Sequence, residues 1–132
     1  DSIMGAILMT MVPLANKGNF IHVYDFRVKP GAGEQFIEMF NEADYSDDNP
    51  MHKSHAQVKD GVLCRDTEDP DRFYLIGEWS DIEVHRAVRK TIKRSGPSFV
   101  DLIEDGRFEP RWGEVVSSTP QEILDKAERQ ST

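Results

Sequence analysis

The chain has 132 residues, of which 24 are acidic and 16 are basic, so its net charge at pH 7 is −8. This length suits one domain that buries a single hydrophobic core without disulfides or a structural metal. A negative surface repels phosphate backbones and anionic lipids, which argues against nucleic acid and membranes as partners.

An apolar stretch, Ile3 to Leu14, precedes the first predicted strand. It is shorter than the ~18 apolar residues that span a bilayer and has no basic flank, so we expect neither a membrane anchor nor a signal peptide. We expect residues 1–19 to form an arm packed on its own domain or on a second subunit, because exposed apolar surface favours aggregation. The single cysteine, Cys64, lies in an apolar run and is expected to be buried. A cytoplasmic location is therefore expected.

The segment "FIHVYDFRVKPG" alternates in the manner of a strand that ends at Lys29-Pro30-Gly31. Its five residues on one face are Phe20, His22, Tyr24, Phe26 and Val28. The next segment, "GEQFIEMFNEA", places apolar residues at helical spacing and predicts an amphipathic helix. A polar loop, "DYSDDNPMHKSH", follows and leads to a second strand over residues 57–65.

The segment "DTEDPD" predicts a hairpin loop, because Pro70 fixes one backbone angle and aspartates favour local turns. A third strand then runs from Arg72 to Trp79. Ser80 and Glu83 have capping-box spacing, so a helix is expected to begin there and to continue over residues 81–93.

The last third of the chain is predicted to hold a short helical turn, a strand and a helix. The turn is indicated by Phe99, Leu102 and Ile103. "RFEPRWGEVVSS" reads as a fourth strand, and its proline makes it an edge or bulged strand. Thr119 as N-cap and Pro120 at the first helical position predict a final helix within residues 118–132.

Residues 20–117 thus run strand, helix, strand, strand, helix, strand. This order predicts an α+β, ferredoxin-like (split βαβ) domain, in which a four-stranded antiparallel sheet carries helices on one face. The first and third strands have apolar residues on both faces, so the second face of the sheet also needs a cover. We expect a homodimer in which two sheets pack together.

Two segments, "VKPGAGEQFIEMF" and "GVLCRDTEDPDRFYLIGEWSDIEVHRA", resemble the antibiotic biosynthesis monooxygenase family of dimeric α/β barrels. The resemblance implies one of three activities: cofactor-free oxygenation of polycyclic phenols or quinols, haem degradation, or no established reaction. Cofactor-free oxygenation requires only that the protein exclude water, promote deprotonation and orient an electron-rich ring. We therefore expect a small aromatic molecule as ligand and no cofactor.

His22 and Tyr24 are the candidate proton acceptor and donor, because they share a strand face with two phenylalanines. A hydrogen-bonded histidine in the core or at a dimer seam is the alternative. The resemblance implies that His85, on the second helix, faces the ligand. The alternative is that His85 is solvated or caps the helix. The candidate aromatic walls are Phe20, Phe26, Trp79 and Trp112. Trp79 also suits a packing anchor, and a buried Glu78 is expected to pair with an arginine such as Arg27 or Arg111.

The sequence bears on three further functions. The resemblance associates haem degradation with an asparagine on the first strand and with a tryptophan and a histidine on the second helix. Asn19 precedes the strand and the helix has no tryptophan, so this activity is disfavoured. His52 and His55 have the spacing of metal ligands and lie beside Asp47 and Asp48, but their segment reads as a flexible polar loop, which favours a solvated loop over a metal site. The same loop could act as a lid over the pocket. The remaining alternative is a non-catalytic module that binds a small ligand or is associated with stress.

Overall fold

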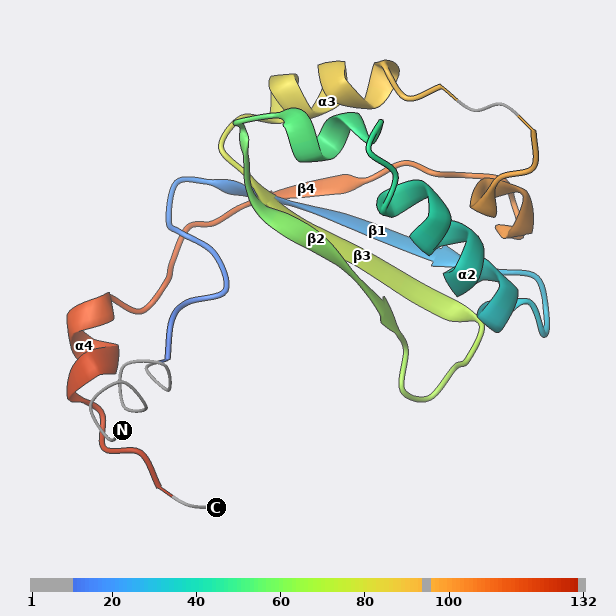
Figure 1. Ribbon diagram of the computed structural model, residues 1–132. Coiled ribbons are helices and arrows are strands. Elements are labelled where there is room, and N and C mark those ends of the chain that lie inside the picture. The colour runs from blue at the N-terminus through green and yellow to red at the C-terminus, as the bar shows by residue number, and fades with distance from the viewer. Residues whose placement is uncertain (1–10, 94–95, 131–132) are drawn as a thin grey trace.

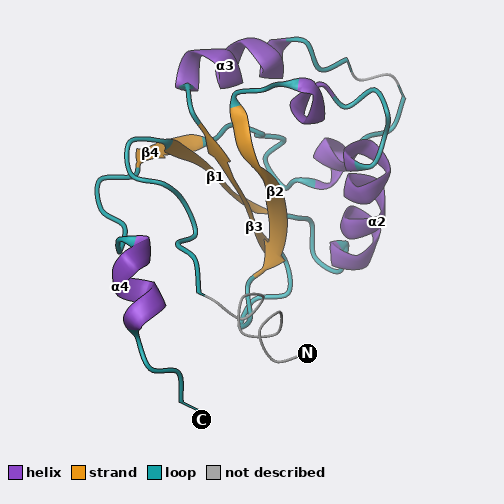
Figure 2. Ribbon diagram, turned by 60° about the vertical axis from the view of Figure 1, so that its left-hand side comes forward, coloured by secondary structure: helices purple, strands orange, loops and turns teal. Residues whose placement is uncertain are grey.

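The computed structural model describes residues 11–93 and 96–130. Four strands form one antiparallel sheet in the order β2-β3-β1-β4: β1 (Phe20–Arg27), β2 (Gln57–Arg65), β3 (Arg72–Trp79) and β4 (Arg111–Glu114). Helices α2 (Gly33–Asp44) and α3 (Ile82–Lys90) lie on one face of the sheet, and α4 (Gln121–Lys126) stands apart from it (Figures 1 and 2). The predicted ferredoxin-like fold is confirmed.

The core forms between the sheet and α2. Tyr24, Phe26 and Val28 point toward the helices from β1 and the residue that follows it, as the alternation predicts. Phe36 of α2 and Phe73 of β3 are 0% and 1% exposed, with ring centroids 4.8 Å apart. Burying a side chain of this size stabilises the fold by about 1.5–3 kcal/mol, so this aromatic contact anchors α2 to the sheet.

β1 is a central strand, paired with β3 on one side and β4 on the other. The register places His22 opposite Gly77 of β3 and opposite Trp112 of β4. A 3-10 helix, η1 (Pro50–Lys53), lies in the loop between α2 and β2, and a second one, η2 (Phe99–Leu102), follows α3. η1 contacts α3 and β2 near the end of the sheet where β1 begins, whereas η2 packs beside the other end of β1, next to Val28.

Three predicted element boundaries are wrong. The N-cap of α3 is Asp81, whose carboxylate accepts the backbone N–H of Glu83 at 2.8 Å, whereas the N–H of Ser80 still bonds to Ala56 as part of the strand pairing. The helix ends at Lys90 rather than at residue 93. Pro120, not Thr119, is the N-cap of α4, and no side chain caps that helix in the described part of the chain.

β4 and Cys64 also differ from expectation. β4 covers four residues, because Pro110 ends the pairing on its N-terminal side; its place at the edge of the sheet is as predicted. Cys64 is exposed, because it pairs with Tyr74 on the face that points away from the helices while its neighbour Leu63 points inward. An apolar run alone does not say which of its residues lie on the buried face.

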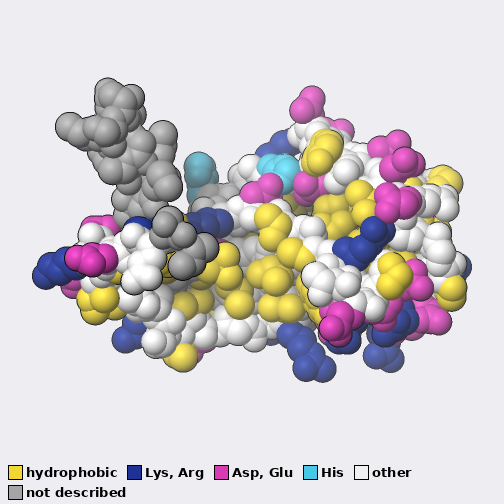
Figure 3. Space-filling view, turned by 90° about the horizontal axis from the view of Figure 1, so that it is seen from below, with side chains coloured by type: hydrophobic (Ala, Val, Ile, Leu, Met, Phe, Trp, Pro, Cys, Tyr) yellow, Lys and Arg dark blue, Asp and Glu magenta, His cyan; other side chains and the backbone are white. Residues whose placement is uncertain are grey.

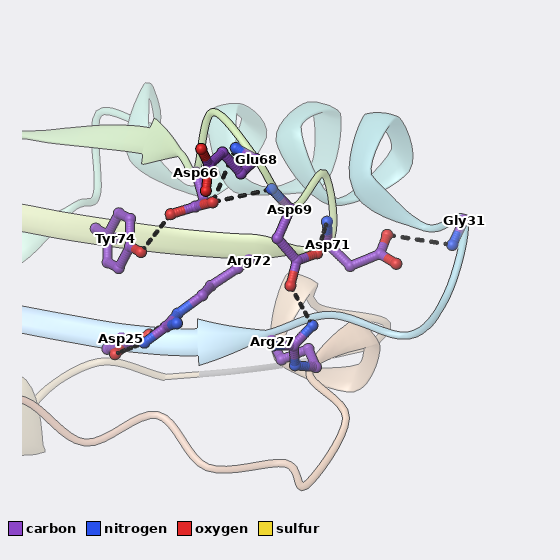
Figure 4. A network of polar contacts seen from close by, with 9 residues as sticks. All are labelled: Asp25, Arg27, Gly31, Asp66, Glu68, Asp69, Asp71, Arg72 and Tyr74. Atoms are coloured by element: carbon purple, nitrogen blue, oxygen red, sulfur yellow. Dashed lines mark hydrogen bonds and ion pairs between the residues drawn. The ribbon is translucent and has the colours of Figure 1, made fainter.

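The face of the sheet opposite α2 and α3 carries an apolar centre and a charged end. Ile21, Val23 and Ile76 are half-buried there, and Val62 is 58% exposed. Viewed from below, hydrophobic side chains form a band across the molecule (Figure 3). At the charged end, Arg72 makes two bonds to Asp25 and the hairpin loop joins a wider polar network (Figure 4).

The apolar arm expected before β1 lies mostly outside the described residues. Its described part includes Met11, Val12 and Leu14, whose side chains are exposed in the single chain. The carbonyl oxygen of Met11 accepts a hydrogen bond from Gln121 at the start of α4, so the two ends of the described chain meet. Among the described residues, none of the helices is long and apolar enough to cross a membrane.

Candidate active site

A cavity of about 700 Å³ lies between the sheet and the helical layer. Its wall combines residues from β1, β3, α2 and α3 with residues from the loops that contain η1 and η2. The three candidate catalytic residues, His22, Tyr24 and His85, all line it. The structure therefore brings His22 and Tyr24 of β1 together with His85 of α3, which is far away in the sequence.

His22, the third residue of β1, forms part of the cavity wall. Its imidazole stacks on that of His85, with ring centroids 4.8 Å apart, and meets the Tyr24 ring edge-on at 5.3 Å. The ring fits because Gly77 lies opposite: a Cβ there would lie 2.7 Å from Cε1 of His22. The position of the His22 ring thus requires a glycine at residue 77. Both side-chain nitrogens of His22 are buried and have no hydrogen-bond partner in residues 11–93 and 96–130.

His85 lies in the first half of α3 and is fully buried. The indole Nε1–H of Trp112 donates a hydrogen bond to its Nδ1 at 2.7 Å, and the Trp79 ring lies 4.5 Å away. Because Nδ1 accepts this bond, the proton of the neutral imidazole is on Nε2. That Nε2–H is buried and has no partner within the described chain.

Both imidazoles are neutral at physiological pH. Burial lowers the pKa of His22 to about 3, and the charges of His85 and Arg89 act in the same direction. Burial, with a contribution from Arg89, lowers the pKa of His85 to about 4. The pair therefore offers uncharged acceptor and donor nitrogens rather than cations.

Arg89 supplies a positive charge beside the cavity. Its guanidinium donates to the carbonyl oxygen of Phe108 and lies 5.7 Å from the centre of the Tyr24 ring and 5.9 Å from that of Phe108. The rings of Tyr24 and Phe108 stack at 4.6 Å, and both line the cavity. The site thus has an aromatic wall with a fixed cation behind it.

The four predicted aromatic wall residues do not line this cavity. Trp79 and Trp112 lie behind it, where they contact His85 and hold its ring; Phe26 belongs to the core around Phe36. The fourth, Phe20, also lies outside the lining.

The aromatic and apolar lining includes instead Phe40, Leu75, Phe99 and Phe108. Phe40 had a signal in the sequence, its place in the helical apolar stripe, whereas Phe108 and Arg89 had none.

Glu78 pairs with none of the arginines that the structure describes, so the expected pairing with Arg27 or Arg111 is wrong. Its Oε2 accepts hydrogen bonds from the backbone N–H of Asn16 at 2.8 Å and from Nδ2 of Asn19 at 2.7 Å. Arg27 instead pairs with Asp69 in the hairpin loop. Glu78 therefore anchors the segment before β1, and the side chain of Asn19 is engaged there rather than in the cavity.

The polar loop between α2 and β2 borders the cavity, since Asp48, Asn49, Pro50 and Met51 belong to its lining. The loop is thus in the position that a lid requires. Within it, His52 does not join His55, Asp47 and Asp48; its Nε2 lies 3.0 Å from Asp60 and 3.6 Å from Asp44.

Comparison with known protein families decides the identity of the domain. The sequence profile described as "antibiotic biosynthesis monooxygenase" matches residues 19–94. The chain belongs to this family. The match extends from the residue before β1 to just beyond α3, so it includes His22, Tyr24 and His85. Comparison with curated proteins found no match.

Solved structures similar to this family member share its fold. The haem-degrading protein Rv3592 from Mycobacterium tuberculosis is 15% identical, with a TM-score of 0.54 over 77% of this chain and 99% of that one. PA3566 from Pseudomonas aeruginosa is 14% identical, with a TM-score of 0.51 over 78% and 97%. SnoaB, a cofactor-independent oxygenase from Streptomyces nogalater, is 16% identical, with a TM-score of 0.50 over 78% and 96%. Family membership and the cavity support a monooxygenase or small-molecule-binding role.

Proposed function

We propose that the protein is a cofactor-independent monooxygenase that acts on a phenolic or quinol-type aromatic molecule. The observation that carries the proposal is the pair of buried, neutral imidazoles in the cavity wall, whose nitrogens His22 Nδ1, His22 Nε2 and His85 Nε2 lack partners within the described chain. Buried polar groups normally have hydrogen-bond partners, so open nitrogens beside a cavity favour a polar ligand.

His22 is the proposed acceptor of the phenolic proton. A pKa of about 3 makes its imidazole a weak base in the free protein. In the complex, the phenolate and the imidazolium would stabilise each other, which reverses the effect of burial on the histidine. Arg89 adds positive potential beside the same wall, and this favours the phenolate further.

His85 is the proposed donor. Because Trp112 fixes its proton on Nε2, the ring can donate to an oxygen atom of the substrate or of a peroxide intermediate. For a ring methylene group conjugated with the phenolate, dioxygen adds to the deprotonated carbon and the resulting hydroperoxide loses water. One methylene and one dioxygen thus give one ring carbonyl and one water, so the substrate supplies all the electrons and no external reductant is needed.

The aromatic wall would orient the ring system. Tyr24 and Phe108 stack on each other at the cavity surface, and Phe99 meets Phe108 edge-on at 5.2 Å. This part of the wall is flat and apolar and suits a polycyclic aromatic ring, while α2, β2 and the loops supply the polar residues of the lining. The cavity volume of about 700 Å³ is within the usual range for small-molecule sites, about 300–1,000 Å³.

The test is oxygen uptake by tag-free protein in excess EDTA, with anthrone, which has a ring methylene conjugated with its phenolate form, and a panel of polycyclic phenols. We expect uptake above the buffer rate that survives chelation and falls at least about tenfold in His22→Phe and in His85→Gln, since acid–base groups contribute about 10²–10⁴-fold. His55→Ala is the matched control, because His55 is exposed and outside the cavity. Equal uptake in all variants, or none on any substrate, contradicts the proposal; in the second case ligand binding without turnover replaces it.

A homodimer is part of the same proposal. The outer face of the sheet leaves Val62 58% exposed, with Ile21, Val23 and Ile76 half-buried around it. A second copy of this face would cover these side chains. We expect sedimentation to give a dimer mass, Val62→Glu to shift the protein toward monomer, and Val84→Glu on α3 to leave it dimeric. A monomer for the unmodified chain at micromolar concentration would refute the dimer.

A further inference from the structure

Three metal-ligating side chains from separate elements meet at the rim of the cavity. Asp44 is the last residue of α2, His52 belongs to η1, and Asp60 lies in β2. One ligand atom of each lies within 4.8 Å of the other two. No two of them are neighbours in sequence, so the cluster is a product of the fold.

The distances suit a single divalent cation. His52 Nε2 is 3.0 Å from Oδ1 of Asp60 and 3.6 Å from Oδ1 of Asp44. Donor atoms that each lie about 2.1 Å from one ion are about 3.0–3.4 Å apart, so two of the three separations already have about the required length. The ligand atoms of Asp44 and Asp60 lie within 4.8 Å of each other, and a small shift of the 58% exposed Asp60 side chain would close this third separation.

Neighbouring groups hold the ligands in place. The backbone N–H of Gly61 donates to Oδ1 of Asp60 at 2.9 Å, and Nδ2 of Asn49 donates to the backbone oxygen of Asp44 at 3.1 Å. Asn49 also caps η1 through Met51, which fixes the segment that carries His52. Support of this kind, one shell out from the ligands, is typical of metal sites.

We propose that Asp44, His52 and Asp60 form a binding site for one divalent transition-metal cation. An imidazole and two carboxylates suit Zn²⁺, Co²⁺ or Mn²⁺ better than Ca²⁺ or Mg²⁺, which prefer oxygen ligands alone. The three protein ligands leave coordination positions for water. The site does not include His55, Asp47 or Asp48, the other members of the loop pattern.

The cation would fix the loop that borders the cavity. The bound cation would join the end of α2 to η1 and to β2, and six residues between Asp44 and Asp60 line the cavity wall. Binding to the folded chain alone stabilises it in proportion to the affinity, so the melting temperature rises with cation concentration. This role does not depend on the proposed oxygenation, which needs no metal.

The test uses the full chain with every affinity tag removed and metal stripped by EDTA and dialysis. Calorimetric titration with Zn²⁺ is expected to show one equivalent bound in the micromolar range, and Co²⁺ is expected to give visible d–d absorption. His52→Ala and Asp60→Asn should each weaken Zn²⁺ binding at least about tenfold and abolish the Zn²⁺-dependent rise in melting temperature. His52 is outside both the cavity lining and the proposed catalytic pair, so oxygen uptake by His52→Ala in EDTA should be unchanged.

The matched controls are His55→Ala and Asp47→Asn, which change the same residue types in the same loop outside the cluster. They are expected to bind Zn²⁺ as the unmodified chain does. The proposal is overturned if the unmodified chain binds no Zn²⁺, if binding survives in both His52→Ala and Asp60→Asn, or if the controls lose it equally. In the first case the cluster is only a hydrogen bond between His52 and Asp60 with Asp44 nearby.

Discussion

Acidification from pH 7 to pH 5 should destabilise the protein through its two buried histidines. The folded chain holds the pKa of His22 at about 3 and that of His85 at about 4, against an ordinary value of 6.5. Below pH 6.5 the unfolded chain therefore binds protons that the folded chain rejects. The sign follows directly: stability is complete above pH 6.5 and is lost as the pH falls toward the folded-state pKa values.

The size of the loss depends little on the folded-state pKa values, because pH 5 lies above both. Protonation of one unfolded histidine with a pKa of 6.5 is worth about 2 kcal/mol at pH 5 relative to pH 7, so the pair accounts for about 4 kcal/mol. The carboxyl groups of Asp25, Asp66 and Asp69, whose pKa values are lowered by their hydrogen bonds, act only at lower pH. Burial raises the pKa of Asp44, which offsets part of the loss.

Urea denaturation at pH 7 and pH 5, at fixed ionic strength, measures this difference in the free energy of unfolding. His22→Phe removes one titrating group, leaves no nitrogen unpaired, and should reduce the loss to about 2 kcal/mol. His55→Ala, at an exposed position, should leave the full loss. A loss below about 1 kcal/mol in the unmodified chain, or an unchanged loss in His22→Phe, would refute the burial of neutral imidazoles.

Three further substitutions test the packing and capping described above. Gly77→Ala places a Cβ 2.7 Å from the His22 ring and 3.1 Å from Cα of Gly61. It should lower the free energy of unfolding in urea by about 1–3 kcal/mol. An unchanged stability would show that the His22 ring moves freely. Asp81→Ala should cost about 1 kcal/mol and Ser80→Ala less than about 0.5 kcal/mol; the reverse order would restore Ser80 as the cap. Trp112→Phe leaves Nδ1 of His85 unpaired and should cost about 1–3 kcal/mol, and an unchanged stability would show that the bond is unimportant.

The sheet and half of the site could be predicted from the sequence. Alternation has a period of two, so it assigns His22 and Tyr24 to one face of β1 without knowledge of the rest of the chain. Helix periodicity and the order of elements then place α3 over that face. The ligand-facing role of His85 came from the family resemblance, and the stacking of its ring on His22 was not predicted.

The rest of the site depends on contacts between distant segments. Arg89 and Phe108 meet through the path of the chain between α3 and β4, which has no periodic pattern. The cluster of Asp44, His52 and Asp60 depends on where β2 begins relative to α2, a register that two bulges in β2 alter. The prediction of the N-cap of α3 failed for a related reason. Ser80 and Asp81 can both cap a helix, and the hydrogen bond of the Ser80 N–H to Ala56 decides between them.

The charge and tautomer of the two buried histidines are the most direct test of the proposed site. Long-range ¹H–¹⁵N correlation spectra of the ¹⁵N-labelled chain at pH 7 report both properties for each ring, with His22→Phe and His85→Gln used for assignment. We expect both His22 and His85 to be neutral and His85 to carry its proton on Nε2, since Trp112 donates to Nδ1. A protonated ring at either position, or a proton on Nδ1 of His85, would contradict the proposed site.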